Sequence, residues 1–98
     1  MNMQAMLKQA QKMQKDMLKT QEKINNTEFM GKSSMVTIKM MGDRKVTEVK
    51  IIADAIEKDD IEALEDMILL ATNDALKQID KITEEKMGSY TKGMPGLF

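Results

Sequence analysis

Apolar and polar positions repeat with different periods along the chain, and the first stretch has a helical period. Residues 1 to about 26 contain no Gly or Pro and are rich in residues that favour helices. A mostly apolar seam recurs at spacings of three and four, at Met3, Met6, Ala10, Met13, Met17, Thr20 and Ile24. Lysines recur in the same way on the roughly opposite face, at Lys8, Lys12, Lys15, Lys19 and Lys23. The pattern predicts an amphipathic helix of roughly 37 Å, so part of the seam must meet another chain or stay exposed.

Between Glu28 and Ile52 the period changes to two, which is typical of half-buried strands. One alternating run holds Val36, Ile38 and Met40, and a second holds Val49 and Ile51. The sequence from Gly42 to Lys45 predicts the hairpin turn between them. A shorter strand is expected from Glu28 to Met30, before Gly31. The pattern predicts an antiparallel meander of two or three strands.

A second helix is predicted after a largely polar connection over residues 53–58. Asp59 and Glu62 have the spacing of a capping box, and Gly88 is the expected C-cap. The apolar stripe of this helix is Ile61, Leu64, Ile68, Ala71, Ala75, Ile79 and Ile82. Residues 89–98, with Gly93, Pro95 and Gly96, are expected to form a flexible tail.

Further apolar residues of this second helix lie outside its stripe, at Met67, Leu69, Leu70 and Leu76. One small sheet covers only one side of a helix, so we expect these residues to meet a partner subunit in a homodimer. A chain of 98 residues has room for one domain, here residues 1–88. The expected fold class is α+β, with a long helix, an antiparallel meander and a second long helix.

The net charge of −1 hides two oppositely charged halves. Residues 1–52 hold ten Lys and Arg against five Asp and Glu, whereas residues 53–98 hold five against eleven. This asymmetry permits a basic surface on an acidic protein. The alternative is that both halves are merely solvated faces of amphipathic helices, and the charges alone do not decide between the two.

The sequence offers little catalytic chemistry. It contains no His or Cys, which removes thiol nucleophiles and zinc sites of the Cys/His kind, and it has no Gly-rich phosphate loop. The acidic cluster Asp59, Asp60, Glu62, Glu65 and Asp66 is explained more simply by helix capping than by a metal. We therefore expect no enzyme activity, no metal, no cofactor and no small-molecule substrate. No apolar run reaches the roughly 20 residues of a membrane span, so we expect a cytoplasmic protein with no membrane partner.

The order of several short segments resembles a known family. These segments are residues 6–14, the strand pair around Gly42, residues 60–67 (DIEALEDM), residues 71–75 (ATNDA) and the closing 93–98 (GMPGLF). Together they are similar to the YbaB/EbfC family of nucleoid-associated DNA-binding proteins. Two loops differ from the family pattern, since Gly31–Met35 replaces a glycine-rich stretch and Asp54-Ala55 replaces Asp-Pro.

The resemblance implies a tweezer-like homodimer with protruding helical arms. It also implies binding to duplex DNA in the nucleoid, with effects on gene expression.

We hypothesise that the lysine face of the first helix contacts DNA phosphates. Weaker candidates for the same surface are Arg44, Lys45, Lys77 and Lys81. Few base-reading side chains accompany the lysines, so recognition is expected to be mainly directed at the backbone. The alternative is a dimeric scaffold that binds another protein through its Met- and Leu-rich surface.

Overall fold

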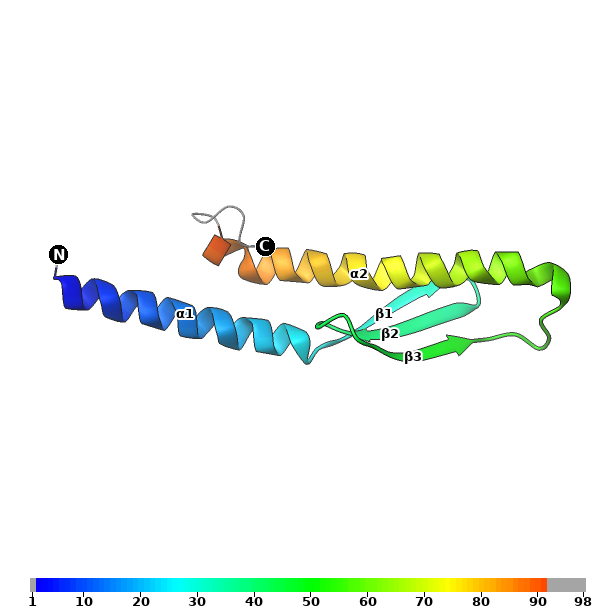
Figure 1. The fold of residues 1–98 in the computed structure, drawn as a ribbon, viewed down its shortest axis with the longest axis horizontal. Helices are drawn as coiled ribbons and strands as arrows, with labels where there is room; N and C mark the ends of the chain where they lie inside the picture. The colour runs from blue at the N-terminus through cyan, green and yellow to red at the C-terminus, as the bar shows by residue number, and fades with distance from the viewer. Residues whose placement is uncertain (1, 92–98) are drawn as a thin grey trace.

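Two long helices and a small sheet form an elongated molecule of 70 × 22 × 14 Å. The computed structural model describes residues 2–91. The elements are α1 (Met3–Asn25), β1 (Glu28–Ser33), β2 (Val36–Met41), β3 (Val46–Ile51), the short 3-10 turn η1 (Lys58–Asp60) and α2 (Ile61–Thr91). α2 lies along one face of the sheet, while α1 projects beyond its end as an arm (Figure 1). The predicted α+β fold is confirmed, with three strands in the meander.

The first helix begins and ends at side chains that satisfy its free backbone groups. The Asn2 carboxamide oxygen accepts a hydrogen bond of 2.9 Å from the Gln4 N–H at the N-terminus. The Thr27 hydroxyl donates to the Lys23 carbonyl at 2.6 Å just beyond the C-terminus. The helix therefore ends at Asn25, which agrees with the predicted limit at about residue 26.

The core lies between α2 and the first two strands. The sheet has the antiparallel order β1-β2-β3, and the inward residues of β2 are Val36, Ile38 and Met40, each at most 2% exposed. They pack beneath Ala71 and Ala75, which are fully buried. These small side chains let the helix approach the sheet closely. The alternation predicted for residues 36–41 is confirmed, because every second residue there is buried.

The first strand is longer than expected because it continues through Gly31. A Cβ at this position would overlap the Ala71 carbonyl oxygen and lie 2.6 Å from the backbone nitrogen of Ala75. Glycine therefore serves as a contact point with the helix, and the strand continues beyond it to Ser33.

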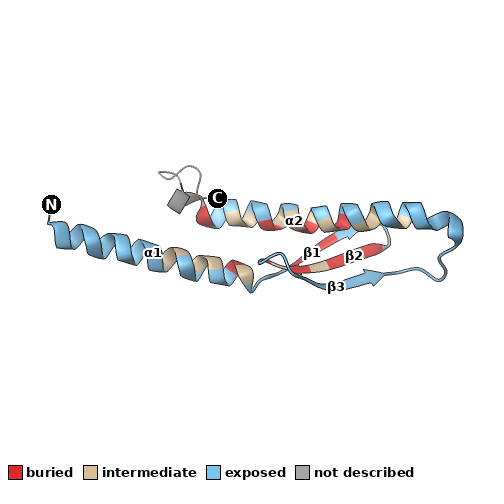
Figure 2. Ribbon diagram, in the orientation of Figure 1, coloured by how far each residue is buried: buried red, intermediate tan, exposed pale blue. Residues whose placement is uncertain are grey.

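The prediction that the third strand is half-buried is wrong. All six residues of β3 are exposed, and Figure 2 shows the strand uniformly pale blue. The reason is that α2 lies over β1 and β2 and leaves β3 uncovered at the edge of the sheet (Figure 1).

Both predicted ends of α2 are wrong. The cap at its start lies two residues earlier than Asp59 and Glu62, because the Asp60 carboxylate accepts a 3.0 Å hydrogen bond from the Glu57 N–H. The 3-10 turn η1 follows this cap at Glu57 and leads directly into α2. At the other end, the helix runs through Gly88 to Thr91, and Met87 is still 3% exposed, so packing continues there. The predicted tail lies outside the described residues from residue 92 onward.

Candidate nucleic-acid interface

The lysine ridge of α1, defined as Lys8, Lys12, Lys15, Lys19 and Lys23, lies entirely on the surface. At about 1.5 Å per residue, it extends along roughly 22 Å of the helix. Within residues 2–91, the ion pairs are Lys39 with Glu48 and Arg44 with Asp80, and neither involves the ridge. Asp16 and Glu22 are the acidic residues on α1, so positive charge predominates along this helix.

The partly buried face of α1 shows which way the lysine ridge points. Met17 and Thr20 are half-buried and Ile24 is 4% exposed, all in the part of α1 that packs against α2. Most of the ridge lies on the far side of α1 from these residues and points away from α2, whereas Lys23 borders a hollow that Ile82 and Lys86 of α2 also line. The first half of α1 has no such cover, and Figure 2 shows it exposed all round. Met3 and Leu7 there are 80% and 58% exposed.

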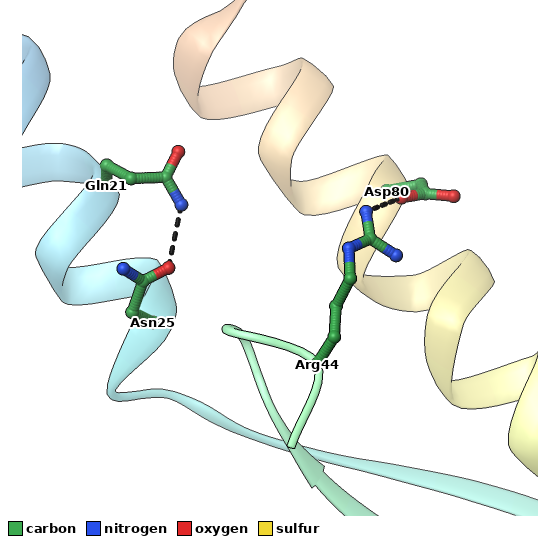
Figure 3. A network of polar contacts seen from close by, with 4 residues as sticks. All are labelled: Gln21, Asn25, Arg44 and Asp80. Atoms are coloured by element: carbon green, nitrogen blue, oxygen red, sulfur yellow. Dashed lines mark hydrogen bonds and ion pairs between the residues drawn. The ribbon is translucent and has the colours of Figure 1, made fainter. Parts of the chain in front are cut away.

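Arg44 lies at the tip of the β2–β3 hairpin, and its guanidinium is paired with another part of the chain. It donates to the carboxylate of Asp80 on α2 (Figure 3). Its backbone adopts a left-handed conformation with φ of 74°, which completes the predicted turn after Gly42. This ion pair connects the hairpin to α2. The neighbouring Lys45 is exposed with no ion pair among the described residues.

Lys77 and Lys81 do not join the ridge. Both are exposed on α2, on the part of its circumference farthest from the buried Ala71, Ala75 and Ile79. They therefore point away from the sheet, whereas the ridge points away from α2. The structure brings the five lysines of α1 together and leaves these two on a separate surface.

A second group of basic residues was missed in the sequence. Lys32, Lys39 and Lys50 line a shallow hollow of about 260 Å³ on the sheet face that α2 does not cover. Lys32 pairs in register with Thr37, and Thr37 pairs with Lys50, so these three residues form one row across the sheet. The alternation within each strand was the signal that could have located them, because the polar positions share the outward face.

The remaining lysine of this hollow is engaged by a carboxylate. The Lys39 ammonium lies 3.0 Å from the Glu48 carboxylate on the adjacent strand. This hydrogen bond and the charge of Lys39 lower the pKa of Glu48 below its usual value of 4.5. In turn, the hydrogen bond with Glu48 and the negative charge of Glu48 raise the pKa of Lys39.

This ion pair gives a testable pH dependence. Because the pKa of Glu48 is lowered in the folded state, the stabilisation is present above pH 4.5 and is lost as the pH falls through the folded pKa. We expect an NMR titration to give Glu48 a pKa below 4.5, and the K39M variant to shift it upward. A pKa for Glu48 that does not change in K39M would contradict this assignment.

The described residues contain no group of three or more His, Cys, Asp or Glu side chains positioned to hold a metal ion. No helix within residues 2–91 has the length and apolar character needed to cross a bilayer.

Comparison with known proteins decides the family. The model of the YbaB/EbfC DNA-binding family matches residues 1–94 of the chain. The chain belongs to this DNA-binding family. Other proteins similar to this chain therefore bear on its YbaB/EbfC fold and on its class of function.

Two bacterial relatives are named nucleoid-associated proteins. One, from Lactococcus lactis subsp. cremoris, is 53% identical over 97% of this chain and 98% of its own length. Another, from Enterococcus faecalis, is 47% identical over 98% of this chain and 94% of its own length. The family and these names identify a DNA-binding, nucleoid-associated protein rather than an enzyme.

A solved structure has the same YbaB/EbfC fold. The crystal structure of an uncharacterized protein from Helicobacter pylori matches with a TM-score of 0.69 and 24% sequence identity. The match covers 98% of this chain and 99% of the other. At this identity, the likeness concerns the fold alone.

Proposed function

We propose that this YbaB/EbfC protein binds duplex DNA as a homodimer, mainly by phosphate contacts from the lysine ridge of each copy. The observation that carries the proposal is the row of five exposed lysines on one face of a projecting helix, without ion pairs within residues 2–91. Such a row neutralises phosphates and releases the counterions condensed on DNA. Its length of roughly 22 Å corresponds to about two-thirds of a turn of B-DNA.

Lysine contacts to phosphate carry little sequence information, because bases are distinguished by their edges in the grooves. The ridge contains no Arg, and the single Arg of the sequence, Arg44, is paired with Asp80. We therefore expect binding with modest sequence preference. This behaviour fits the name of its relatives, which are called nucleoid-associated proteins. We propose that the protein organises the nucleoid within the cytoplasm and thereby affects gene expression.

Exposed apolar side chains support the homodimer. Leu69 and Leu70 on α2 are each 59% exposed, although they lie next to a well-packed core. Met67 and Leu76 are half-buried against the core of their own chain, so less of their apolar surface is left for a partner subunit to cover. The two exposed leucines are accordingly the stronger contacts within this predicted interface.

The salt dependence of binding tests the DNA contact. Fluorescence anisotropy of a labelled duplex is expected to give a log–log plot of affinity against salt with a slope of about −0.9 for each phosphate neutralised. One fully engaged ridge corresponds to a slope of about −4.5, and two ridges to about −9. Affinity that stays constant between about 50 and 200 mM salt would contradict the proposal.

The exposed methionines and leucines of α1 favour a second candidate function, a dimeric scaffold for another protein. Met6 and Met13 remain 53% and 41% exposed there, and Met side chains adapt to varied partners. Pull-down from nuclease-treated lysate separates the two functions. A stoichiometric protein that survives nuclease supports the scaffold, and loss of all co-purified material supports DNA binding.

A further inference from the structure

The sheet face that α2 leaves uncovered carries a row of polar side chains, one from each strand. Lys32 on β1, Thr37 on β2 and Lys50 on β3 are partners in the sheet register, and all three line the hollow on this face. Neighbouring strands are about 4.8 Å apart, so the Cα atoms of the two lysines are about 10 Å apart, with Thr37 between them. The long, flexible stems of the lysines let both ammonium groups reach a point above the Thr37 hydroxyl. The row thus directs three hydrogen-bond donors to one place.

The chain itself does not use these donors. Neither of the two ion pairs found within residues 2–91 involves Lys32 or Lys50. In the same part of the chain, no hydrogen bond engages the Thr37 hydroxyl. The nearby carboxylates act on Lys39 instead, which is bonded to Glu48. Three lysines and one glutamate line the hollow, so its net charge is +2.

Hydrogen bonds from α2 fix the strand that carries Lys32. The Asp74 carboxylate accepts a 3.0 Å hydrogen bond from the Lys32 backbone N–H. Beside it, the Gln78 side-chain amide donates to the Met30 carbonyl at 2.8 Å. These bonds anchor the backbone of β1, and the Lys32 side chain is left to point from the uncovered face. The site is therefore largely preformed, which lowers the entropic cost of binding a ligand.

The size and shape of the hollow select the class of ligand. Its volume is about 260 Å³. Pockets for small molecules are usually about 300–1,000 Å³ and enclose most of the ligand. A shallow, positively charged hollow instead suits an anionic group that projects from a larger surface. A backbone phosphate of duplex DNA is such a group, and its free oxygens accept hydrogen bonds from lysines and hydroxyls.

The hollow lies on the same side of the molecule as most of the lysine ridge. α1 and the sheet lie on one side of α2, and β1 continues in the direction of α1 (Figure 1). Lys32 is about 13 Å beyond the start of β1. Ridge and hollow together therefore extend along about 40 Å, slightly more than one turn of B-DNA. One duplex can in this way contact both surfaces.

We propose that the hollow binds a phosphate of the same duplex that the ridge contacts, with Lys32 and Lys50 on either side of it and the Thr37 hydroxyl donating to it. This inference rests on the proposed function and extends the DNA contact from α1 onto the sheet. Each copy of the chain then neutralises at least one phosphate more than its ridge does. The engaged Lys39 contributes less, because Glu48 compensates its charge.

Neutralising the row tests the contact. K32Q/K50Q is expected to weaken duplex binding about tenfold and to make the slope of log affinity against log salt shallower by about 0.9 for each hollow engaged. K77Q/K81Q is the matched control, because it removes the same charge from exposed lysines that point away from the sheet. We expect this control to bind within about twofold of the wild type. Equal losses in both variants, or no loss in K32Q/K50Q, would overturn the inference.

A gain of affinity provides a second test, which a misfolded variant could not pass. E48Q removes the carboxylate that lines the hollow and frees Lys39 to contact the duplex. We expect E48Q to tighten duplex binding about threefold. The control E84Q makes the same change at an exposed position of α2 and is expected to bind more nearly as the wild type does. Unchanged or weaker binding by E48Q, or an equal gain in E84Q, would contradict the assignment.

NMR of the wild-type protein separates this inference from the proposed function. Adding unlabelled duplex is expected to shift the backbone amide signals of Thr37 and Lys50 together with those of the ridge. Shifts confined to the ridge would overturn the inference and leave the proposed function in place. A duplex that shifts neither set would overturn both. If inorganic phosphate shifted Thr37 and Lys50 while the duplex did not, the hollow would have to be removed from the DNA interface.

Discussion

Replacing Lys12, Lys15 and Lys19 together with Ala is expected to weaken duplex binding roughly 100-fold for each ridge engaged, since each of the three phosphate contacts of a ridge contributes about 1 kcal/mol. The slope of log affinity against log salt should become shallower by about 2.7 for each ridge engaged. All three lysines are exposed and without ion pairs among the described residues, so folding does not depend on their charges. Fluorescence anisotropy at several salt concentrations measures both effects.

The same helix provides a matched control. Gln9, Gln11 and Gln14 are also exposed on α1, and their triple Ala variant changes the same number of side chains without changing the charge. Ala favours helix at both sets of positions, so circular dichroism should show α1 intact in both variants. The glutamine variant is expected to bind as the wild type does. Unchanged affinity in the lysine variant would remove the ridge from the interface.

The sequence predicted those elements whose burial follows a simple period. The alternation over residues 36–41 has one face against α2, so period two in the sequence became alternate burial in the structure. The three- and four-residue spacing of the lysines likewise became one exposed face of α1, because a helix aligns such positions whatever they contact. The candidate interface could therefore be located from local spacing alone.

Features that depend on distant parts of the chain could not be predicted in this way. β3 has the same alternating pattern as β2, yet it is exposed because α2 is only wide enough to cover two strands. Arg44 was a candidate for DNA, but Asp80, 36 residues away, engages it. No local pattern reports such a pairing. Gly88 resembled a C-cap, although packing of the adjacent Met87 continues the helix past it.

The close approach of α2 to the sheet depends on Gly31, and G31A is expected to destabilise the protein by about 3–5 kcal/mol. The new methyl group would collide with the backbone of α2 at Ala71 and Ala75, which cannot rotate away as a flexible side chain would. Moving α2 outward would also stretch the hydrogen bonds that Asp74 and Gln78 make to the flanking residues of β1. Urea unfolding followed by circular dichroism measures the loss.

The same substitution at Gly88 shows why the site, and not the added methyl group, determines this result. A Cβ at Gly88 meets no atom within 4 Å, and the residue lies inside a helix. G88A is therefore expected to stabilise the protein by about 0.5–1 kcal/mol, because Ala restricts the unfolded chain and favours helix. The two variants should shift the unfolding midpoint in opposite directions. If G31A unfolded at the wild-type urea concentration, the close helix–sheet contact at Gly31 would have to be abandoned.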